Sequence, residues 1–201
     1  MIIEIKSISG KVLYTSEALD IRECLESAVK DCTDLRNADL RNANLRNADL
    51  RHANLWYADL RNADLRNANL WYADLRNANL RNANLQNADL RHADLRNANL
   101  RNANLQNANL RHANLWYANL RNANLRDDIK IQKHPIQINA LKYYVTIWDN
   151  HIQIGCEFHS VKDWFSFDKQ RIAEMGGRDA LKWWAGWKKP LRAICRAEGR
   201  T

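Results

Sequence analysis

Arginine is the residue whose spacing most suggests a binding chemistry in this chain. Between residues 33 and 127 there are fourteen arginines and nine aspartates, so this segment carries a net charge of +5. Arginines and tryptophans recur there at multiples of twenty residues: Arg41, Arg61, Arg81, Arg101 and Arg121 in one set, and Trp56 and Trp116 in another. Guanidinium groups beside aromatic rings are typical of surfaces that bind a nucleic-acid backbone or another partner.

The alternative is a solvated surface on which the arginines pair with aspartates before the leucines. Six aspartates are well placed for this: Asp34, Asp39, Asp59, Asp64, Asp74 and Asp94. Exposed pairs of this kind contribute only about 0–1 kcal/mol each to stability. The sequence favours this solvated surface over a nucleic-acid site.

Histidine and cysteine give weaker signals of metal binding. Cys156 and His159 form a C-x-x-H pair, but Cys195 and His151 would have to be recruited by the fold to complete a zinc site. Another set recurs every twenty residues: His52, Tyr72, His92 and His112. Ligands stacked on one flat face rarely converge tetrahedrally. We therefore predict no metal site and no cofactor.

The chain also lacks the motifs of familiar catalytic sites. It contains no G-x-S-x-G, no H-E-x-x-H and no glycine-rich phosphate loop. The aspartates of residues 33–127 are expected on exposed turns, away from a concave pocket that could shift their pKa values. We predict that the protein is not an enzyme.

An uninterrupted five-residue repeat, A-[D/N]-L-x-x, must position these side chains. Nineteen leucines mark its core: Leu35, Leu40, Leu45, Leu50, Leu55, Leu60, Leu65, Leu70, Leu75, Leu80, Leu85, Leu90, Leu95, Leu100, Leu105, Leu110, Leu115, Leu120 and Leu125. A helix would spread these leucines around its axis, and a straight strand would alternate them between two faces. A chain that turns a corner once per repeat points every leucine inward.

The number of sides per coil is less certain from the residues alone. His52, His92 and His112 differ by multiples of twenty, which favours four sides of five residues. The Trp-Tyr pairs beginning at Trp56, Trp71 and Trp116 differ by 15 and 45 residues, which suits three sides. We favour four sides.

The nineteen units resemble the pentapeptide-repeat family, whose fold is a right-handed quadrilateral parallel β-helix. The resemblance implies about 4.75 coils and a rod roughly 23 Å long at the ~4.8 Å spacing of strands. So regular an array could also come from consensus engineering. Some family members protect DNA gyrase by imitating duplex DNA, but that mimicry needs an acidic surface, and this repeat is basic.

Both ends of a solenoid need caps, because they expose core and unpaired backbone groups. Residues 1–32 are expected to form one, with strands at Ile2–Lys6 and Lys11–Thr15. A helix should begin after Asp20, with Glu23 completing a capping box, and end near Asp31. Its apolar face is Ile21, Cys24, Leu25, Ala28 and Val29.

Residues 128–201 are expected to form an α+β unit. The expected strands are Ile129–Gln132, Ile136–Asn139, Lys142–Trp148 and His151–Cys156, the last two forming a hairpin around Asp149-Asn150. Ser160 should cap a helix through Trp164, and another helix should begin near Arg178 and kink or restart at Pro190. This tail resembles the C-terminal segment of uncharacterised pentapeptide-repeat proteins from phages and prophages.

The second helix carries an apolar stripe and several basic residues. Trp183, Trp184 and Trp187 should pack on the hairpin or on the last coil, or form a docking or dimer surface. The basic residues could add to a nucleic-acid surface: Arg178, Lys182, Lys188, Lys189, Arg192 and Arg196.

These patterns predict a non-catalytic scaffold or protein-interaction module built on a rigid rod. The alternative is nucleic-acid binding through the arginine columns and the basic helix. The first residues alternate apolar and polar types instead of forming a signal peptide, and no apolar run is long enough to span a membrane. We therefore expect a cytoplasmic protein that does not bind a membrane, with its four cysteines reduced.

Overall fold

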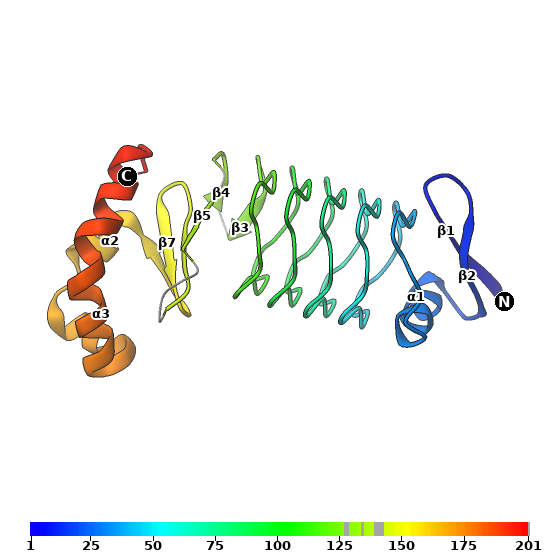
Figure 1. The fold of residues 1–201 in the computed structure, drawn as a ribbon, viewed down its shortest axis with the longest axis horizontal. Helices are drawn as coiled ribbons and strands as arrows, with labels where there is room; N and C mark the ends of the chain where they lie inside the picture. The colour runs from blue at the N-terminus through cyan, green and yellow to red at the C-terminus, as the bar shows by residue number, and fades with distance from the viewer. Residues whose placement is uncertain (127–128, 134, 139–142, 201) are drawn as a thin grey trace. The chain divides into compact units, whose positions relative to one another are not determined.

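The computed structural model describes residues 1–126, 129–133, 135–138 and 143–200. The chain divides into two compact units, Met1–His134 and Pro135–Thr201, which are described separately (Figure 1). Asp127, Asn139 and Lys142, where three expected elements end or begin, lie outside the described residues.

Each repeat of the first unit ends in a tight turn. In a representative unit, the backbone N–H of Ala43 donates to the carbonyl of Leu40 at 3.2 Å, so the chain turns a corner across Arg41 and Asn42. Asn42 has φ = 60°, in the left-handed region that asparagine tolerates better than most residues. This backbone requirement explains why asparagine dominates the position two residues after each leucine.

Successive coils pair as parallel strands offset by twenty residues. Bridges of this kind run from Asp39–Asp59 to Asn104–Asn124. The N–H of Leu40 donates to the carbonyl of Asp59, and the N–H of Asp59 donates to Ala38, both at 2.8 Å. Four five-residue sides therefore make one coil, as the histidine spacing predicted. The three-sided alternative suggested by the Trp-Tyr pairs is wrong.

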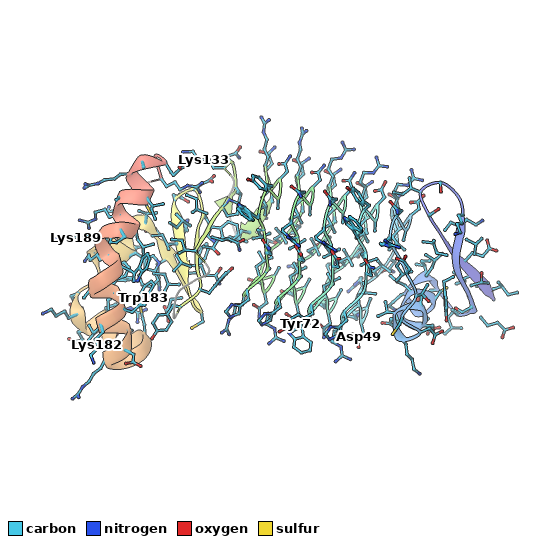
Figure 2. The ribbon with its side chains drawn as sticks, in the orientation of Figure 1. Asp49, Tyr72, Lys133, Lys182, Trp183 and Lys189 are labelled. Carbon is cyan, nitrogen blue, oxygen red and sulfur yellow. The ribbon has the colours of Figure 1, made fainter. Side chains whose placement is uncertain are left out.

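The interior of the β-helix is a column of stacked leucines. All nineteen repeat leucines are buried, and the most exposed of them, Leu125 at the last coil, keeps only 7% of its surface. Most of the preceding alanines are also buried, because the turn leaves room there for only a small side chain. The side chains beyond each leucine project outward, as Tyr72 does in Figure 2.

The N-terminal residues cap the first coil. Strand β1 (Ile2–Lys6) pairs antiparallel with β2 (Val12–Glu17), and helix α1 (Ile21–Lys30) follows (Figure 1). The side chain of Asp20 accepts from the N–H of Glu23 as expected, but Glu23 accepts from the N–H of Leu19. Backbone groups of the first coil bond to this cap: Ile8 donates to Asn37, and Asp39 donates to Lys6, both at 2.8 Å.

A short antiparallel pair, β3 (Asn124–Arg126) with β4 (Ile129–Lys130), follows the last coil. The N–H of Asn122 donates to the carbonyl of Ile131 at 2.7 Å, and Ile131 donates back to Ala123 at 3.0 Å. Residues 129–133 therefore belong to the first unit, although the sequence suggested that the C-terminal unit begins at residue 128.

The second unit is an antiparallel sheet with helices. Its strands are β5 (Ile136–Ile138), β6 (Val145–Ile147), β7 (His151–Ile154) and β8 (Glu157–Ser160), paired in that order. The hairpin around Asp149-Asn150 forms as expected, whereas β8 was not predicted. Helix α2 (Val161–Ser166) is capped by Ser160, which accepts from the N–H of Asp163 at 2.9 Å.

Helix α3 (Lys169–Ala197) differs from the sequence-based expectation in two respects. Its first two turns precede Gly176-Gly177 and were not predicted. The helical conformation is interrupted at Gly176-Gly177, as expected. Gly177 has φ = 65° and ψ = −152°, a conformation that essentially requires glycine. Pro190 lies within the helix without ending it. No helix in the described ranges is long and apolar enough to cross a membrane.

Candidate binding edge of the β-helix

The corners of the coil decide which side chains can meet a partner. Each turn places the two residues after a leucine at a corner, and the twenty-residue offset stacks equivalent corners into an edge. Arg41, Arg61, Arg81, Arg101 and Arg121 lie along one such edge, as predicted by their spacing. Neighbouring guanidinium groups thus start from backbone positions about 4.8 Å apart.

Most arginines of the early coils pair with an aspartate two residues before them. Arg41 contacts Asp39 through Nε at 2.7 Å and Nη2 at 2.6 Å, and Arg61 contacts Asp59 in the same way. Six further pairs repeat this geometry: Arg36–Asp34, Arg51–Asp49, Arg66–Asp64, Arg76–Asp74, Arg91–Asp89 and Arg96–Asp94. Every aspartate between residues 33 and 126 is therefore paired, as the solvated-surface interpretation expected.

The pairing also stabilises the ionised carboxylates. Hydrogen bonds from Arg41 hold the pKa of the Asp39 carboxyl below its usual value, and Arg91 does the same for Asp89. These aspartates are consequently charged at neutral pH and neutralise their own arginines.

Three arginines on the same edge lack such a partner. Asparagine stands two residues before Arg81, Arg101 and Arg121, at the position that aspartate occupies before Arg41 and Arg61. The three side chains are exposed, and among the described residues no carboxylate lies within 4 Å of their nitrogens. We call these three residues the arginine edge.

The net charge of the repeat becomes more positive from its N-terminal to its C-terminal coils. Residues 33–94 contain nine arginines and eight aspartates, for a net charge of +1. Residues 95–126 contain five arginines and no acidic residue, for a net charge of +5. The late coils therefore present a basic surface. In the early coils, aspartates of the same coils neutralise most of the arginines.

An asparagine ladder runs beside the arginine edge. The side-chain amide of Asn102 donates to the Oδ1 of Asn82 at 3.0 Å, and that of Asn122 donates to Asn102 at 3.3 Å. Gln132 extends the ladder by donating to Asn122 at 3.2 Å. These bonds link the side chains at the corners of successive coils. Sequence reasoning missed the ladder, although its twenty-residue recurrence was visible.

Trp56 and Trp116, the two tryptophans singled out in the sequence, lie on a different edge of the coil from the arginine edge. The ring of Trp56 lies between the guanidinium groups of Arg36 and Arg76, whose central carbons are 6.0 and 5.1 Å from its centroid. Trp116 is exposed and stacks on Tyr117 with 5.5 Å between ring centroids. Of these two tryptophans, Trp116 is therefore the one that offers an open aromatic surface, together with the exposed Tyr117.

The histidine set forms a stacked column on another edge. Ring centroids are 5.5 Å apart for His52 and Tyr72, 4.6 Å for Tyr72 and His92, and 4.8 Å for His92 and His112. Burial, followed by the charges of His112 and nearby arginines, lowers the pKa of His92. This arrangement is one of stacked rings on successive coils, as expected.

The three candidate tryptophans of α3 pack in or beside the hydrophobic core of the second unit. Trp184 is 6% exposed and packs in a core with Val145, Ile147 and Trp164. Trp183 and Trp187 are half-buried beside that core, with ring centroids 6.1 Å apart (Figure 2 labels Trp183).

The two residues of the C-x-x-H pair have different surroundings. Cys156 is exposed, whereas His159 contacts the Oε2 of Glu157 at 2.7 Å. Among the described residues, no three histidine, cysteine or acidic side chains gather as metal ligands would.

Comparison with known proteins agrees with this geometry. The model of the family of pentapeptide repeats matches eight copies within residues 31–127. This chain belongs to the pentapeptide-repeat family. Its four-sided coil is the right-handed quadrilateral β-helix of that family. No curated protein matches the chain significantly.

Solved pentapeptide-repeat proteins resemble part of this chain. One from the cyanobacterium Cyanothece 51142 is 44% identical over 43% of this chain and 58% of its own, with a TM-score of 0.43. One from the Arabidopsis thaliana thylakoid lumen is 34% identical over 45% and 63%, also with 0.43. One from Nostoc PCC 7120 is 34% identical over 55% and 77%, with 0.31. The chain thus spans less than two thirds of the first two.

Proposed function

We propose that this pentapeptide-repeat protein is a non-catalytic interaction scaffold whose arginine edge binds an acidic segment of a partner protein. One observation carries the proposal: every described aspartate of the repeat pairs with an arginine, yet Arg81, Arg101 and Arg121 have no carboxylate partner among the residues that the structure describes. Guanidinium groups bind carboxylates with paired hydrogen bonds, so an acidic segment can supply what these three arginines lack.

The rigidity of the rod supports the same proposal. Backbone bonds of 2.7–3.1 Å join each coil to the next, and the asparagine ladder fixes the corner residues beside the arginines. Preorganised groups lose less conformational entropy on binding. The arginine edge therefore needs little rearrangement to meet an extended acidic chain.

The test compares two variants that lose equal charge. Arg81→Gln/Arg101→Gln/Arg121→Gln removes the arginine edge, whereas Arg36→Gln/Arg51→Gln/Arg91→Gln removes three arginines that pair with aspartates. Binding of a fluorescent oligoglutamate peptide should be lost at least tenfold more in the first variant, because each charged hydrogen bond contributes about 1.5–3 kcal/mol. Equal losses would show that only net charge matters and would refute a specific edge.

Single-stranded nucleic acid is a second candidate ligand. The observation in its favour is the exposed Trp116–Tyr117 pair beside the basic coils, since aromatic rings stack on bases. Three phosphate contacts predict that the logarithm of affinity falls with the logarithm of salt concentration with a slope of about −2. Trp116→Ala should weaken oligothymidylate binding and leave oligoglutamate binding unchanged. A slope near zero would remove this candidate.

A further inference from the structure

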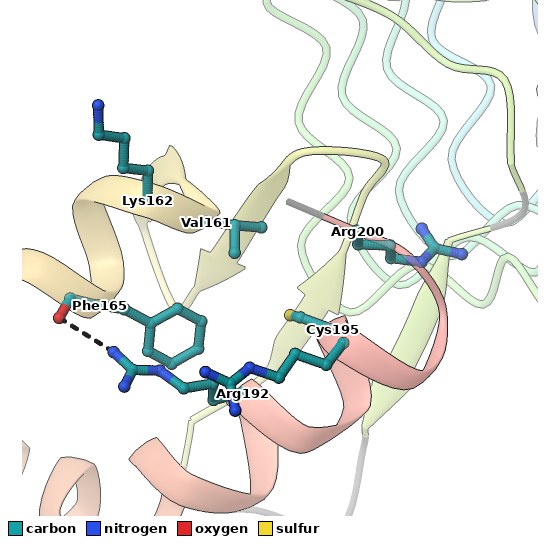
Figure 3. A pocket seen from close by; sticks show the side chains of 7 residues that line it. Val161, Lys162, Phe165, Arg192, Cys195 and Arg200 are labelled. Atoms are coloured by element: carbon teal, nitrogen blue, oxygen red, sulfur yellow. Dashed lines mark hydrogen bonds between the residues drawn. The ribbon is translucent and has the colours of Figure 1, made fainter.

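A cavity in the second unit combines an apolar floor with a cationic rim. Its volume is about 330 Å³, near the lower end of small-molecule sites. Seven residues line it: Val161, Lys162, Phe165, Arg192, Cys195, Arg196 and Arg200. Figure 3 shows the Phe165 ring and the Cys195 thiol within this cavity, between α2 and the last turns of α3.

Four of the seven lining residues are basic and none is acidic. Lys162 and Arg196 are exposed at the rim. Among the described residues, no carboxylate forms an ion pair with Lys162, Arg192 or Arg196. Among the described lining residues, an anion entering the cavity would therefore meet several positive charges and no acidic side chain.

Two of the guanidinium groups are held in place by the fold. Arg192 donates from Nη2 to the carbonyl of Phe165 at 3.4 Å, and its central carbon lies 4.7 Å from the centroid of the Phe165 ring (Figure 3). Arg200 is 3% exposed and donates from Nη1 to the carbonyl of Ile147 at 3.2 Å. One hydrogen bond leaves most of the five N–H donors of Arg192 available to a ligand.

The floor of the cavity is apolar. Val161 and Cys195 are buried, and Phe165 is half-buried. Burial raises the pKa of the Cys195 thiol, so at neutral pH it is a neutral group that can pack against hydrocarbon. The same shift argues against thiolate chemistry in the cavity.

We propose that this cavity binds a small amphiphilic carboxylate, with its hydrocarbon body on Val161, Phe165 and Cys195. The carboxylate lies among the guanidinium groups of Arg192 and Arg196, which supply charged donors at the rim. A second cavity of about 690 Å³ on the same helix makes a useful contrast, because its lining includes the Asp168 carboxylate as well as Lys182 and Lys188. The ligand should prefer the first cavity, where no lining residue repels it.

Calorimetry of the full chain with octanoate, octanamide and acetate tests this proposal. Octanoate should bind saturably. Octanamide lacks the negative charge and acetate lacks the hydrocarbon chain, so each should bind at least about tenfold more weakly. Equal binding of octanoate and octanamide, or no saturable binding of octanoate, would overturn the proposal.

Variants locate the site. Arg196→Gln should weaken octanoate binding about tenfold. Lys189→Gln removes an exposed charge outside both cavities, and Lys182→Gln removes one from the second cavity; neither should change the affinity. An unchanged thermal midpoint for Arg196→Gln excludes unfolding as the cause. A loss as large in Lys189→Gln or Lys182→Gln would contradict the assignment.

Discussion

The imidazole rings of His92 and His112 stack with 4.8 Å between centroids and 15° between planes, at equivalent corners of neighbouring coils. Because the two residues are twenty positions apart, their contact directly records a coil of four five-residue sides. It also places two titratable groups within reach of each other and of Arg91 and Arg111.

This stack predicts a pH-dependent stability. The pKa of His92 is lowered, first by burial and then by nearby positive charge, so the unfolded chain binds this proton at higher pH than the folded chain. The contribution of His92 is therefore complete above its ordinary pKa of about 6.5 and declines as pH falls towards the folded value. The thermal midpoint should drop between about pH 7.5 and pH 5.5. His92→Asn, which restores the residue most common at that corner, should reduce this drop; an unchanged drop would contradict the explanation.

The leucine column predicts that interior truncations are costly. Leu80 is completely buried in a middle coil, so Leu80→Ala should lower the free energy of unfolding by about 2–5 kcal/mol. Arg81→Ala changes the adjacent exposed residue and should cost no more than about 0.5 kcal/mol. Chemical denaturation of both variants measures the difference, and similar costs would argue against a closely packed column.

Helix α1 supplies a side chain that completes the first coil. The Oε1 of Glu26 accepts the backbone N–H of Asp49 at 2.8 Å, in place of the carbonyl that a preceding coil would provide. Glu26→Ala should destabilise the chain by about 0.5–1.5 kcal/mol, as measured by denaturation. Glu26→Gln keeps an acceptor oxygen and should lose less. Equal losses in the two variants would mean that this hydrogen bond contributes nothing.

Trp184 and Trp116 make a matched pair of buried and exposed tryptophans. Trp184 is 6% exposed and Trp116 is 65% exposed. Trp184→Ala should cost about 3–5 kcal/mol of stability, whereas Trp116→Ala should cost less than about 1 kcal/mol. Thermal melts distinguish them. A small effect at Trp184 would contradict its structural role and would favour a docking surface formed by Trp183, Trp184 and Trp187.

The repeat region was predictable because a five-residue period is incompatible with a regular helix or strand. Four sides remained uncertain because the Trp-Tyr pairs differ by fifteen residues, and the backbone pairing that decides the question is not local in sequence. Arg81 and Arg101 could have been separated from Arg41 and Arg61 by sequence, since asparagine replaces aspartate two residues before them.

The second unit was less predictable. Strand β8 is only four residues long and ends on Ser160, which is also the N-cap of α2, so its pattern gave no separate signal. The cationic cavity joins α2 with the end of α3, and Arg192 reaches Phe165 across 27 residues of sequence. Such contacts depend on how the helices pack on the sheet, which no local pattern specifies.

The arginine edge is tested most directly by NMR of the arginine side-chain Nε–Hε groups during titration with an oligoglutamate peptide. The signals of Arg81, Arg101 and Arg121 should shift together and saturate, because no carboxylate in the described part of the chain pairs with their guanidinium groups. The signals of Arg36, Arg51 and Arg91 should change little, because their aspartates already occupy them. Equal shifts in the two groups, or shifts confined to the paired arginines, would contradict the account.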